Sequence, residues 1–392
     1  MLASGAGPEA LAAALESGAP HLTPLDDHAG FRSQRRPGHA ALARHVDLSR
    51  WLPAARARRM SLPSRYASAA AAMALAGAGR GPGVEDEAVA VVLATAFGTA
   101  KYAEDLVREI LIQGPENASP SLFSESVANA PAAQVAIGAG ARGANLAVTQ
   151  REAGPLLAVI LAARELRLGR SGFALAGCYE EVNPLIHAVL SRFRALAVNE
   201  DGGSAARPFD RDRTGFLAAE GSAVLAIERA ADAAARGARP LARLVAWEQA
   251  FDPTATAHGW GTGAEALAAR LAAGLARRGV EPASIDRVVS GASGSVAGDA
   301  LEAAVLRRLF AGRVPPVLAP KGVTGEHAGG QLAAAVLAAG GAAAWPTAGF
   351  RTPDPALGLV PHDGSPLPPA RRVLASALAA GGAAAWLVLD AP

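Results

Sequence analysis

Glu152 is the residue of this sequence best placed to take part in chemistry. It occupies a short turn between an apolar stretch at 144–149 and a long apolar segment that begins at Pro155. A carboxylate at the start of a helix can act as a base or hold a cation in place. The helix N-terminus would lower its pKa, whereas burial among apolar residues would raise it. The sequence alone therefore leaves the basicity of Glu152 open.

Lys321 is the second candidate, because lysine is rare in this chain. Only Lys101 and Lys321 are lysines among 37 basic side chains, and all the others are arginine. An ammonium in such a background indicates that lysine, rather than any positive charge, is needed at this position. A structural ion pair with Glu302 or Glu326 is the more ordinary explanation, since buried charges are normally paired.

Several other polar or unusual residues predict structural roles. Glu220 and Asp299 have the apolar surroundings of buried polar anchors. Cys178, the only cysteine, follows an apolar strand at 173–176 and is interpreted as a buried small hydrophobe rather than a nucleophile. A single cysteine excludes an internal disulfide, and the histidines lack metal-ligand spacing, so we expect no metal and no cofactor. The glycine-rich segment 258–263 lacks the preceding strand of a dinucleotide-binding fingerprint.

The composition indicates a protein with a large core and no nucleic-acid or membrane role. Of the 392 residues, 51% are hydrophobic and 18% are charged. The 37 basic and 35 acidic side chains form no basic run of the kind that binds nucleic acid. The most apolar window, 332–344, is too short to span a membrane, and we expect no signal peptide. These features predict a cytoplasmic protein.

Predicted strands and helices alternate along the chain. The strand signals are continuous apolar runs, as in strands that are covered on both faces, and helical spacing follows several of them. This alternation predicts an α/β fold in two halves, 1–230 and 231–392, joined near residues 229–240. The strands are expected at 88–95, 144–149, 173–176, 222–227, 241–247, 287–290, 317–319 and 384–389, and helices at 155–168, 263–278 and 299–309.

The segment Arg207–Glu228 is the most specific motif of the chain. It reads RPFDRDRTGFLAAEGSAVLAIE, with a charged turn, a Gly-Phe pair and a Glu-Gly pair before a strand. This segment resembles the RPFD…GF…EGA.VL.LE stretch of the β-ketoacyl-acyl-carrier-protein synthases. The resemblance implies their thiolase-like layered αβαβα fold, made of two similar halves. Further segments that resemble the family cover nearly the whole chain: 52–60, 127–137, 161–169, 174–177, 298–302 and 320–325.

The departures from the family pattern fall on the residues that carry its chemistry. The resemblance implies an acylated cysteine at the start of a helix and two histidines that assist malonyl decarboxylation and condensation. Counting back from Gly169 places Glu152 at the cysteine position. Counting back from Asp299 places Gly291 at the position of the first histidine. A carboxylate cannot carry the acyl thioester, and glycine has no side chain that could donate a hydrogen bond.

The position of the second histidine has two possible assignments. Counting forward from Lys321 gives Glu326, which we prefer, and counting back from Gly330 gives His327 with one inserted residue. The late glycine-rich loop of the family is also altered, because Ala380 stands where a gating phenylalanine is usual. We therefore expect no intact catalytic residue, although Lys321 is retained.

These replacements favour a non-condensing, chain-length-factor-type subunit. By resemblance, such subunits of type II polyketide and aryl polyene systems pair with an active ketosynthase and shape the acyl tunnel at the shared interface. The implied partners are that ketosynthase, as a heterodimer, and an acyl carrier protein, with the tunnel lining within residues 101–132. The alternative is an enzyme with altered chemistry, such as malonyl-carrier-protein decarboxylation that uses Glu152. A stand-alone binding protein, or a homodimer with no catalytic partner, is a third hypothesis.

The resemblance starts after the family's first strand, because Met1–Leu11 resembles the segment that comes next in the family. A strand missing from the N-terminal sheet would leave buried backbone groups unpaired. We therefore expect either a start codon placed too late or a compensating rearrangement.

Overall fold

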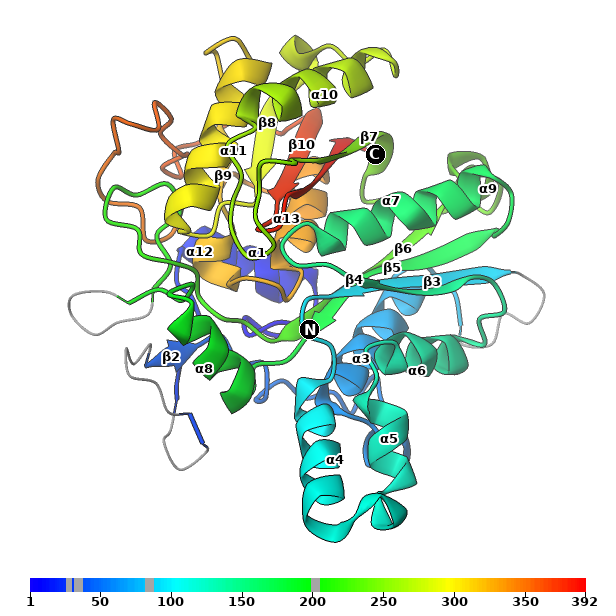
Figure 1. The fold of residues 1–392 in the computed structure, drawn as a ribbon. Coiled ribbons are helices and arrows are strands. Elements are labelled where there is room, and N and C mark those ends of the chain that lie inside the picture. Colours follow the sequence, from blue (N-terminus) through cyan, green and yellow to red (C-terminus); the bar gives the residue numbers. More distant parts are fainter. Residues whose placement is uncertain (26–29, 32–37, 82–87, 199–204) are drawn as a thin grey trace.

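The computed structural model describes residues 1–392 except 26–29, 32–37, 82–87 and 199–204 (Figure 1). Its strands form two large sheets, and each of these sheets has helices on both faces. Within the described ranges, no helix is both long and apolar enough to cross a membrane.

The first sheet has four strands in the order β4-β3-β5-β6. The central strand β3 (Val89–Thr95) is parallel to β4 (Asn145–Thr149) and to β5 (Phe173–Glu180), and β6 (Gly221–Glu228) is antiparallel to β5. Every residue of β3 and β5 is buried, which explains their continuous apolar sequences. The prediction ended the third strand at residue 176, but β5 continues to Glu180 because its last residues pair with the start of β6.

The edge strand β4 differs from the prediction. Its apolar sequence predicted a strand buried on both faces, whereas most of its residues are exposed. It pairs with β3 on one side, and no described strand pairs with its other edge. An apolar, exposed edge strand is a typical site for pairing with another chain.

The second sheet has five strands in the order β7-β11-β10-β8-β9. Strand β8 is parallel to β9 and β10, and β11 is antiparallel to β10 and β7. The sequence interpretation missed β10, because its alanine-rich sequence lies next to glycines that were assigned to a loop. The bounds are β7 (Arg243–Phe251), β8 (Arg287–Ser290), β9 (Val317–Leu318), β10 (Arg372–Leu378) and β11 (Ala383–Asp390).

Two helices form a middle layer between the sheets (Figure 1). Helix α7 (Gly154–Arg167) packs on β3 and β5 of the first sheet and on β11 of the second, and α13 (Gly330–Ala339) packs on β6, β8, β10 and β11. Outer helices cover the remaining faces, and the predicted layered αβαβα fold is confirmed. They are α3 (Leu62–Gly77) and α6 (Ala130–Ala139) on the first sheet, and α10 (Ala264–Ala276) and α11 (Val296–Leu309) on the second.

The helix ends show how local chemistry adjusts the predicted bounds. Helix α11 begins before the predicted residue 299, because the hydroxyl of Ser295 accepts a hydrogen bond from the N–H of Gly298 and caps the helix. The remaining elements are α1 (Pro8–Ser17), β1 (Thr23–Pro24), β2 (His39–Ala40), α2 (Ala54–Ala57), α4 (Ala100–Gln113), α5 (Pro120–Ser126), α8 (Pro184–Arg192), α9 (Ala230–Ala235) and α12 (Lys321–Thr324).

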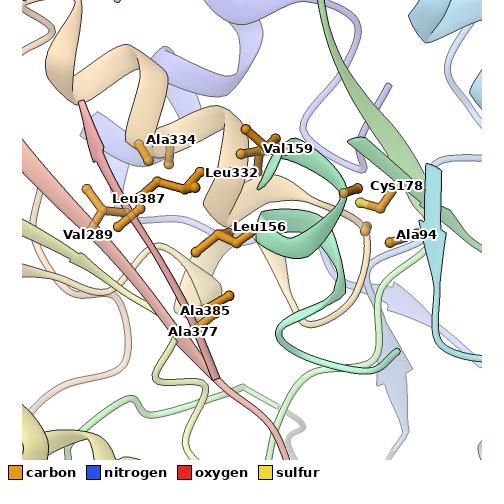
Figure 2. Packing of buried hydrophobic residues seen from close by; sticks show 14 of the residues in the cluster. Ala94, Leu156, Val159, Cys178, Val289, Leu332, Ala334, Ala377, Ala385 and Leu387 are labelled. Carbon is orange, nitrogen blue, oxygen red and sulfur yellow. The ribbon is translucent and has the colours of Figure 1, made fainter. Parts of the chain in front are cut away.

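One hydrophobic cluster joins the two sheets through the middle layer (Figure 2). Leu156 and Val159 of α7 lie in it together with Cys178 of the first sheet and Leu387 of the second. The cluster therefore draws on both predicted halves of the chain. Each large sheet takes its strands from one side of residues 229–240, but the division into two domains there stays a prediction.

Candidate functional site

Glu152 lies in the turn between β4 and α7, two residues before the helix begins. It is only 7% exposed. Its Oε2 atom is buried and has no hydrogen-bond partner among the described residues. The helix can start close to β3 because Gly154 has no side chain, since an added Cβ would lie 3.1 Å from the Cβ of Ala94. The turn therefore presents a buried carboxylate with one unsatisfied oxygen.

Lys321 and Glu326 form a buried ion pair. The Nζ of Lys321 lies 2.5 Å from Oε1 of Glu326, and the two side chains are 4% and 1% exposed. The sequence allowed Glu302 as the other partner. Glu302 instead accepts hydrogen bonds from the hydroxyl of Ser290 and the backbone N–H of Gly291. The structure thus selects Glu326 as the counter-ion of the retained lysine.

Glu152 is coupled electrostatically to this ion pair. Burial raises the pKa of Glu152 to about 7, and the negative charge of Glu326 adds to the effect while Lys321 opposes it. Burial is the largest influence on Glu326 and acts to raise its pKa, but Lys321 and His327 together outweigh burial and leave that pKa below its ordinary value. Glu326 therefore carries the negative charge, and Glu152 gains or loses its proton near neutral pH.

His327 is partly buried beside the ion pair, and its Nδ1 atom is buried. Its ring lies edge-on to those of Phe97 and Phe216, with ring centroids 5.3 and 5.4 Å away. Burial lowers the pKa of His327 to about 4, so its imidazole is neutral at neutral pH. Its φ of 76° is a conformation that residues other than glycine rarely adopt. Glu326 and His327 are thus both in the cluster, and the assignment of one of them to the family's second histidine stays a prediction.

Gly291 directly follows β8 at a point where a side chain does not fit. An added Cβ would lie 2.8 Å from the carbonyl oxygen of Ser376 and 3.1 Å from the Cα of Ala377, both in β10. Gln331 of α13 occupies the adjoining space, and its side-chain amide donates a hydrogen bond to the same carbonyl at 2.6 Å. The position predicted for the first histidine is therefore closed by backbone, which cannot move aside as a side chain can.

Ala380 lies in the tight turn between β10 and β11 and is buried. The strand predicted at 384–389 corresponds to β11, which begins one residue earlier. Leu378 belongs to β10, and β11 starts at residue 383, so only residues 379–382 form the turn. Gly381 and Gly382 make it possible, with φ values of 91° and 93°.

The thiol of Cys178 is unsuited to nucleophilic chemistry. Cys178 is buried in β5, and its Sγ donates to the carbonyl oxygen of His327 at 3.6 Å. Burial raises the pKa of the thiol to about 12. Because the thiolate is the nucleophilic form, this residue serves packing, as the sequence indicated.

Glu220 and Asp299 are structural anchors, as predicted. Glu220 accepts hydrogen bonds from the hydroxyl of Tyr66 at 2.9 Å and from the guanidinium of Arg44 at 3.2 Å. Asp299 accepts one from the backbone N–H of Phe209 at 2.8 Å. Phe209 lies within the RPFD turn, so this bond ties the most specific motif of the sequence to the start of α11.

Sequence reasoning missed the aromatic and amide side chains that surround the charged cluster. Phe97 follows the carboxyl end of β3, where open α/β sheets commonly place site residues, and this position was the available signal. Phe216 lies in the Gly-Phe pair of the quoted motif and reaches His327. Gln331 sits at the start of α13 and gave no signal, because its role depends on the carbonyl of Ser376 from a distant segment.

Several known proteins resemble this chain in sequence or in fold. The sequence profile of the β-ketoacyl synthase N-terminal domain matches residues 1–233. The 3-oxoacyl-[acyl-carrier-protein] synthase 2 of Synechocystis sp. is 29% identical over 69% of this chain, and the match spans 66% of that protein's own length, just under two thirds. The tetracenomycin polyketide synthase ketoacyl synthase beta subunit of Streptomyces glaucescens is 32% identical over 70% of this chain and 68% of its own. The solved structure of the ishigamide ketosynthase/chain length factor is 26% identical and superposes with a TM-score of 0.86, covering 100% of this chain and 96% of that one.

Proposed function

This chain belongs to the β-ketoacyl synthase family, and from that premise we propose that it is a non-condensing, chain-length-factor-type subunit. It pairs with an active β-ketoacyl-acyl-carrier-protein synthase in polyketide or fatty acid synthesis. The observation that carries the proposal is the buried Lys321–Glu326 ion pair beside Glu152. Carboxylates held in this way offer no thiolate to accept an acyl group, and the one imidazole described beside them, that of His327, packs between Phe97 and Phe216.

The closed position at Gly291 supports the same conclusion. A histidine there would require the backbone of β10 to shift, because the carbonyl oxygen of Ser376 would lie 2.8 Å from the β-carbon of any residue larger than glycine. The proposed loss of the histidine at Gly291 therefore involves the packing of β8 against β10 as well as the identity of one side chain. A site repacked in this way no longer depends on the family's chemistry, while the fold that a partner would recognise is kept.

An exposed apolar surface supports pairing with another subunit. We call it the pairing surface and define it as Val107, Leu111, Ile112, Phe123, Ile137 and Leu146. Its members come from α4, α5, α6 and the edge strand β4, all in the first half of the chain. Leu111 and Ile112 of α4 are 79% and 74% exposed. Large exposed apolar side chains gathered on one region mark interfaces. Helices α4 and α5 project away from the sheets (Figure 1), which makes their exposed apolar side chains accessible to a partner subunit.

In the proposed complex the partner makes the carbon–carbon bond, and this chain shapes the acyl tunnel. Residues 101–132, assigned to the tunnel lining by resemblance, form α4, α5 and their connections at the pairing surface. The names of two relatives support the assignment, since one is a ketoacyl synthase beta subunit and another structure contains a ketosynthase/chain length factor. An acyl carrier protein would deliver the substrate to the partner.

Co-expression tests the pairing directly. The chain is produced together with a cysteine-containing ketosynthase from the same organism, and the complex is measured by size exclusion with light scattering. We expect a heterodimer that the double variant Leu111→Asp/Phe123→Asp abolishes. Val360→Asp is the control, because Val360 is 63% exposed but lies in the second half, outside the pairing surface. Exclusive homodimers of the wild type, with no complex, would contradict the proposal and favour a stand-alone protein.

The raised pKa of Glu152 favours one alternative function, decarboxylation of a malonyl group on a carrier protein. Decarboxylation leaves a carbanion that needs a proton, and Glu152 is protonated below its pKa of about 7. The isolated chain would then release CO₂ from malonyl-carrier protein, with activity falling as the pH rises through 7 and lost in Glu152→Gln. Absence of CO₂ release with every carrier tested would rule this alternative out.

A further inference from the structure

A separate cavity of about 530 Å³ opens where the N-terminal ends of α3 and α4 meet the junction between β5 and α8. We call it the α3–α4 cavity. Its volume is within the range of small-molecule sites. The apolar part of its wall includes Leu48, Leu62 and Tyr102. None of the residues of the charged cluster around Glu152 lines it, so the cavity is distinct from that cluster. Only Lys101 and Tyr102 of its wall belong to the segment 101–132 that is assigned above to the acyl tunnel.

Three cations line the α3–α4 cavity, and two of them have carboxylate partners. Arg44 pairs with Glu220 at 3.2 Å, and Lys101 pairs with Asp105 one turn along α4. Arg65 donates from Nε to a main-chain carbonyl at 3.0 Å, and no carboxylate in the described part of the chain pairs with it. Within the described ranges, Arg65 therefore brings a positive charge without a carboxylate partner to the cavity wall.

A buried side chain with an unused donor stands in the same wall. Asn183 is 3% exposed, and its Oδ1 accepts the N–H of Ile186, which caps α8. Its Nδ2 is buried and has no partner among the residues that the structure describes. One helical turn later, His187 is 2% exposed and both of its ring nitrogens lack partners as well. Buried polar atoms without partners are rare in folded proteins and commonly meet a ligand or water.

We propose that the α3–α4 cavity binds an amphipathic monocarboxylate. The carboxylate lies on the guanidinium of Arg65 and accepts a hydrogen bond from Nδ2 of Asn183. The apolar body lies against Leu48, Leu62 and Tyr102. The charge of the ligand follows from the wall, since a single uncompensated guanidinium matches a single negative charge. A dianionic phosphate would place a second negative charge near Glu220.

Glu181 also lines the cavity, and it does not oppose a carboxylate ligand strongly. Its carboxylate accepts the backbone N–H of Lys101 at 2.7 Å, so part of its charge is already neutralised. Burial raises the pKa of Glu181 to about 7, which leaves it partly protonated at neutral pH. The inference rests on the cavity itself and stands whether or not the chain pairs with a ketosynthase.

Calorimetric titration of the full chain with octanoate tests the proposal, with octanol as the matched ligand that lacks the charge. We expect one octanoate per chain and at least tenfold weaker binding of octanol, the factor associated with losing a charged hydrogen bond. Arg65→Gln is expected to weaken octanoate binding by a similar factor. Arg108→Gln is the control, because Arg108 lies on α4 outside the cavity and pairs with Glu104. It should leave binding unchanged.

A second variant tests the same cavity in case Arg65→Gln does not fold. Leu48→Trp fills the cavity from an irregular segment without removing a charge, and we expect it to abolish octanoate binding while circular dichroism stays unchanged. The proposal is overturned if octanoate does not bind, if octanol binds equally well, or if Arg108→Gln weakens binding as much as Arg65→Gln does. A crystal structure with octanoate bound elsewhere would overturn it as well.

Discussion

The buried charges around Glu152 stabilise one another as a set. Removing an ion from water costs several kcal/mol, and Lys321 and Glu326 compensate for this by direct contact at 2.5 Å. No described cation forms an ion pair with Glu152, although Lys321 and Arg151 act on it from nearby, and it holds its proton until the pH approaches 7. With Glu152 protonated, the three side chains carry no net charge, which is the arrangement that a buried site tolerates best.

Glu326 therefore depends on the ammonium of Lys321 to remain charged in the core, and removal of Lys321 should destabilise the fold. Lys321→Met is expected to lower the free energy of unfolding by about 3–5 kcal/mol, because it leaves the charge of Glu326 buried and unpaired. The double variant Lys321→Met/Glu326→Leu should regain most of the loss, since it removes both charges. Urea denaturation measures both. Equal destabilisation by the single and double variants would show that the pair acts only through packing.

The pH dependence of stability tests the protonation of Glu152. In the unfolded chain Glu152 ionises at its ordinary pKa of 4.5, whereas in the folded chain it keeps its proton up to about 7. Between these values the folded state binds the additional proton, so the stability falls as the pH rises. A span of about 2.5 pH units corresponds to roughly 3 kcal/mol. Between pH 4.5 and 7, the free energy of unfolding of the wild type should therefore fall by up to this amount more than that of Glu152→Gln.

Glu265→Gln serves as the control for this measurement, because Glu265 is exposed on the first turn of α10. It should keep the wild-type pH dependence. If Glu152→Gln also keeps it, then Glu152 is not the group that holds its proton in the folded state.

At the scale of elements, the contact between β8 and β10 decides what the site can contain. The two strands are parallel and in register from Arg287 to Ser290, which brings the end of β8 close to the carbonyl of Ser376. Gly291 follows at once and has no space for a β-carbon. The lack of space for a side chain at Gly291, where the sequence predicts the position of the first histidine, therefore depends on how β8 and β10 pack.

Substitution of this glycine measures the closeness of the contact. Gly291→Ala is expected to lower the free energy of unfolding by about 1–3 kcal/mol, because backbone must shift to admit the methyl group. Gly77→Ala is the matched control, since Gly77 ends α3 with nothing within 4 Å of an added Cβ. It should leave the stability unchanged or raise it by up to about 1 kcal/mol. A harmless Gly291→Ala would mean that β8 and β10 have room to separate.

At the scale of the whole molecule, the two sheets share one core. Helix α7 is continuous with the first sheet in sequence but buries Leu156 in a cluster that includes Leu387 of the second sheet and Leu332 of α13 (Figure 2). The predicted halves therefore cover each other's apolar surface. Neither half is expected to retain a close-packed core when the other is removed.

This sharing predicts cooperative unfolding. Calorimetry of the full chain should show a single transition, although the chain is long enough for two domains. A fragment of residues 1–230 lacks α13, β10 and β11, and it should bind a hydrophobic dye and melt without a cooperative transition. Two resolved transitions in the full chain, or a fragment that melts cooperatively, would show that the predicted halves are independent domains.

Much of this protein can be deduced from sequence alone, where the signals are local. Continuous apolar runs predicted β3 and β8 closely, and helical spacing predicted α7, α10 and α11 to within a few residues. The register of the same helix also predicts that Glu152 stands at the nucleophile position of the family, and this assignment stays a prediction. Such inferences succeed because strand and helix periodicity depend on residues that are near one another in the chain.

Other features were decided only by the tertiary structure. The exposure of β4, the counter-ion of Lys321 and the lack of space at Gly291 each depend on segments far apart in sequence. An apolar run looks the same whether its strand lies in the centre of a sheet or at the edge, and a glutamate's sequence position does not say which lysine it reaches. The sequence thus determined the fold and predicts which residues of the family are replaced, whereas packing determined that Glu152, Lys321 and Glu326 form one buried cluster.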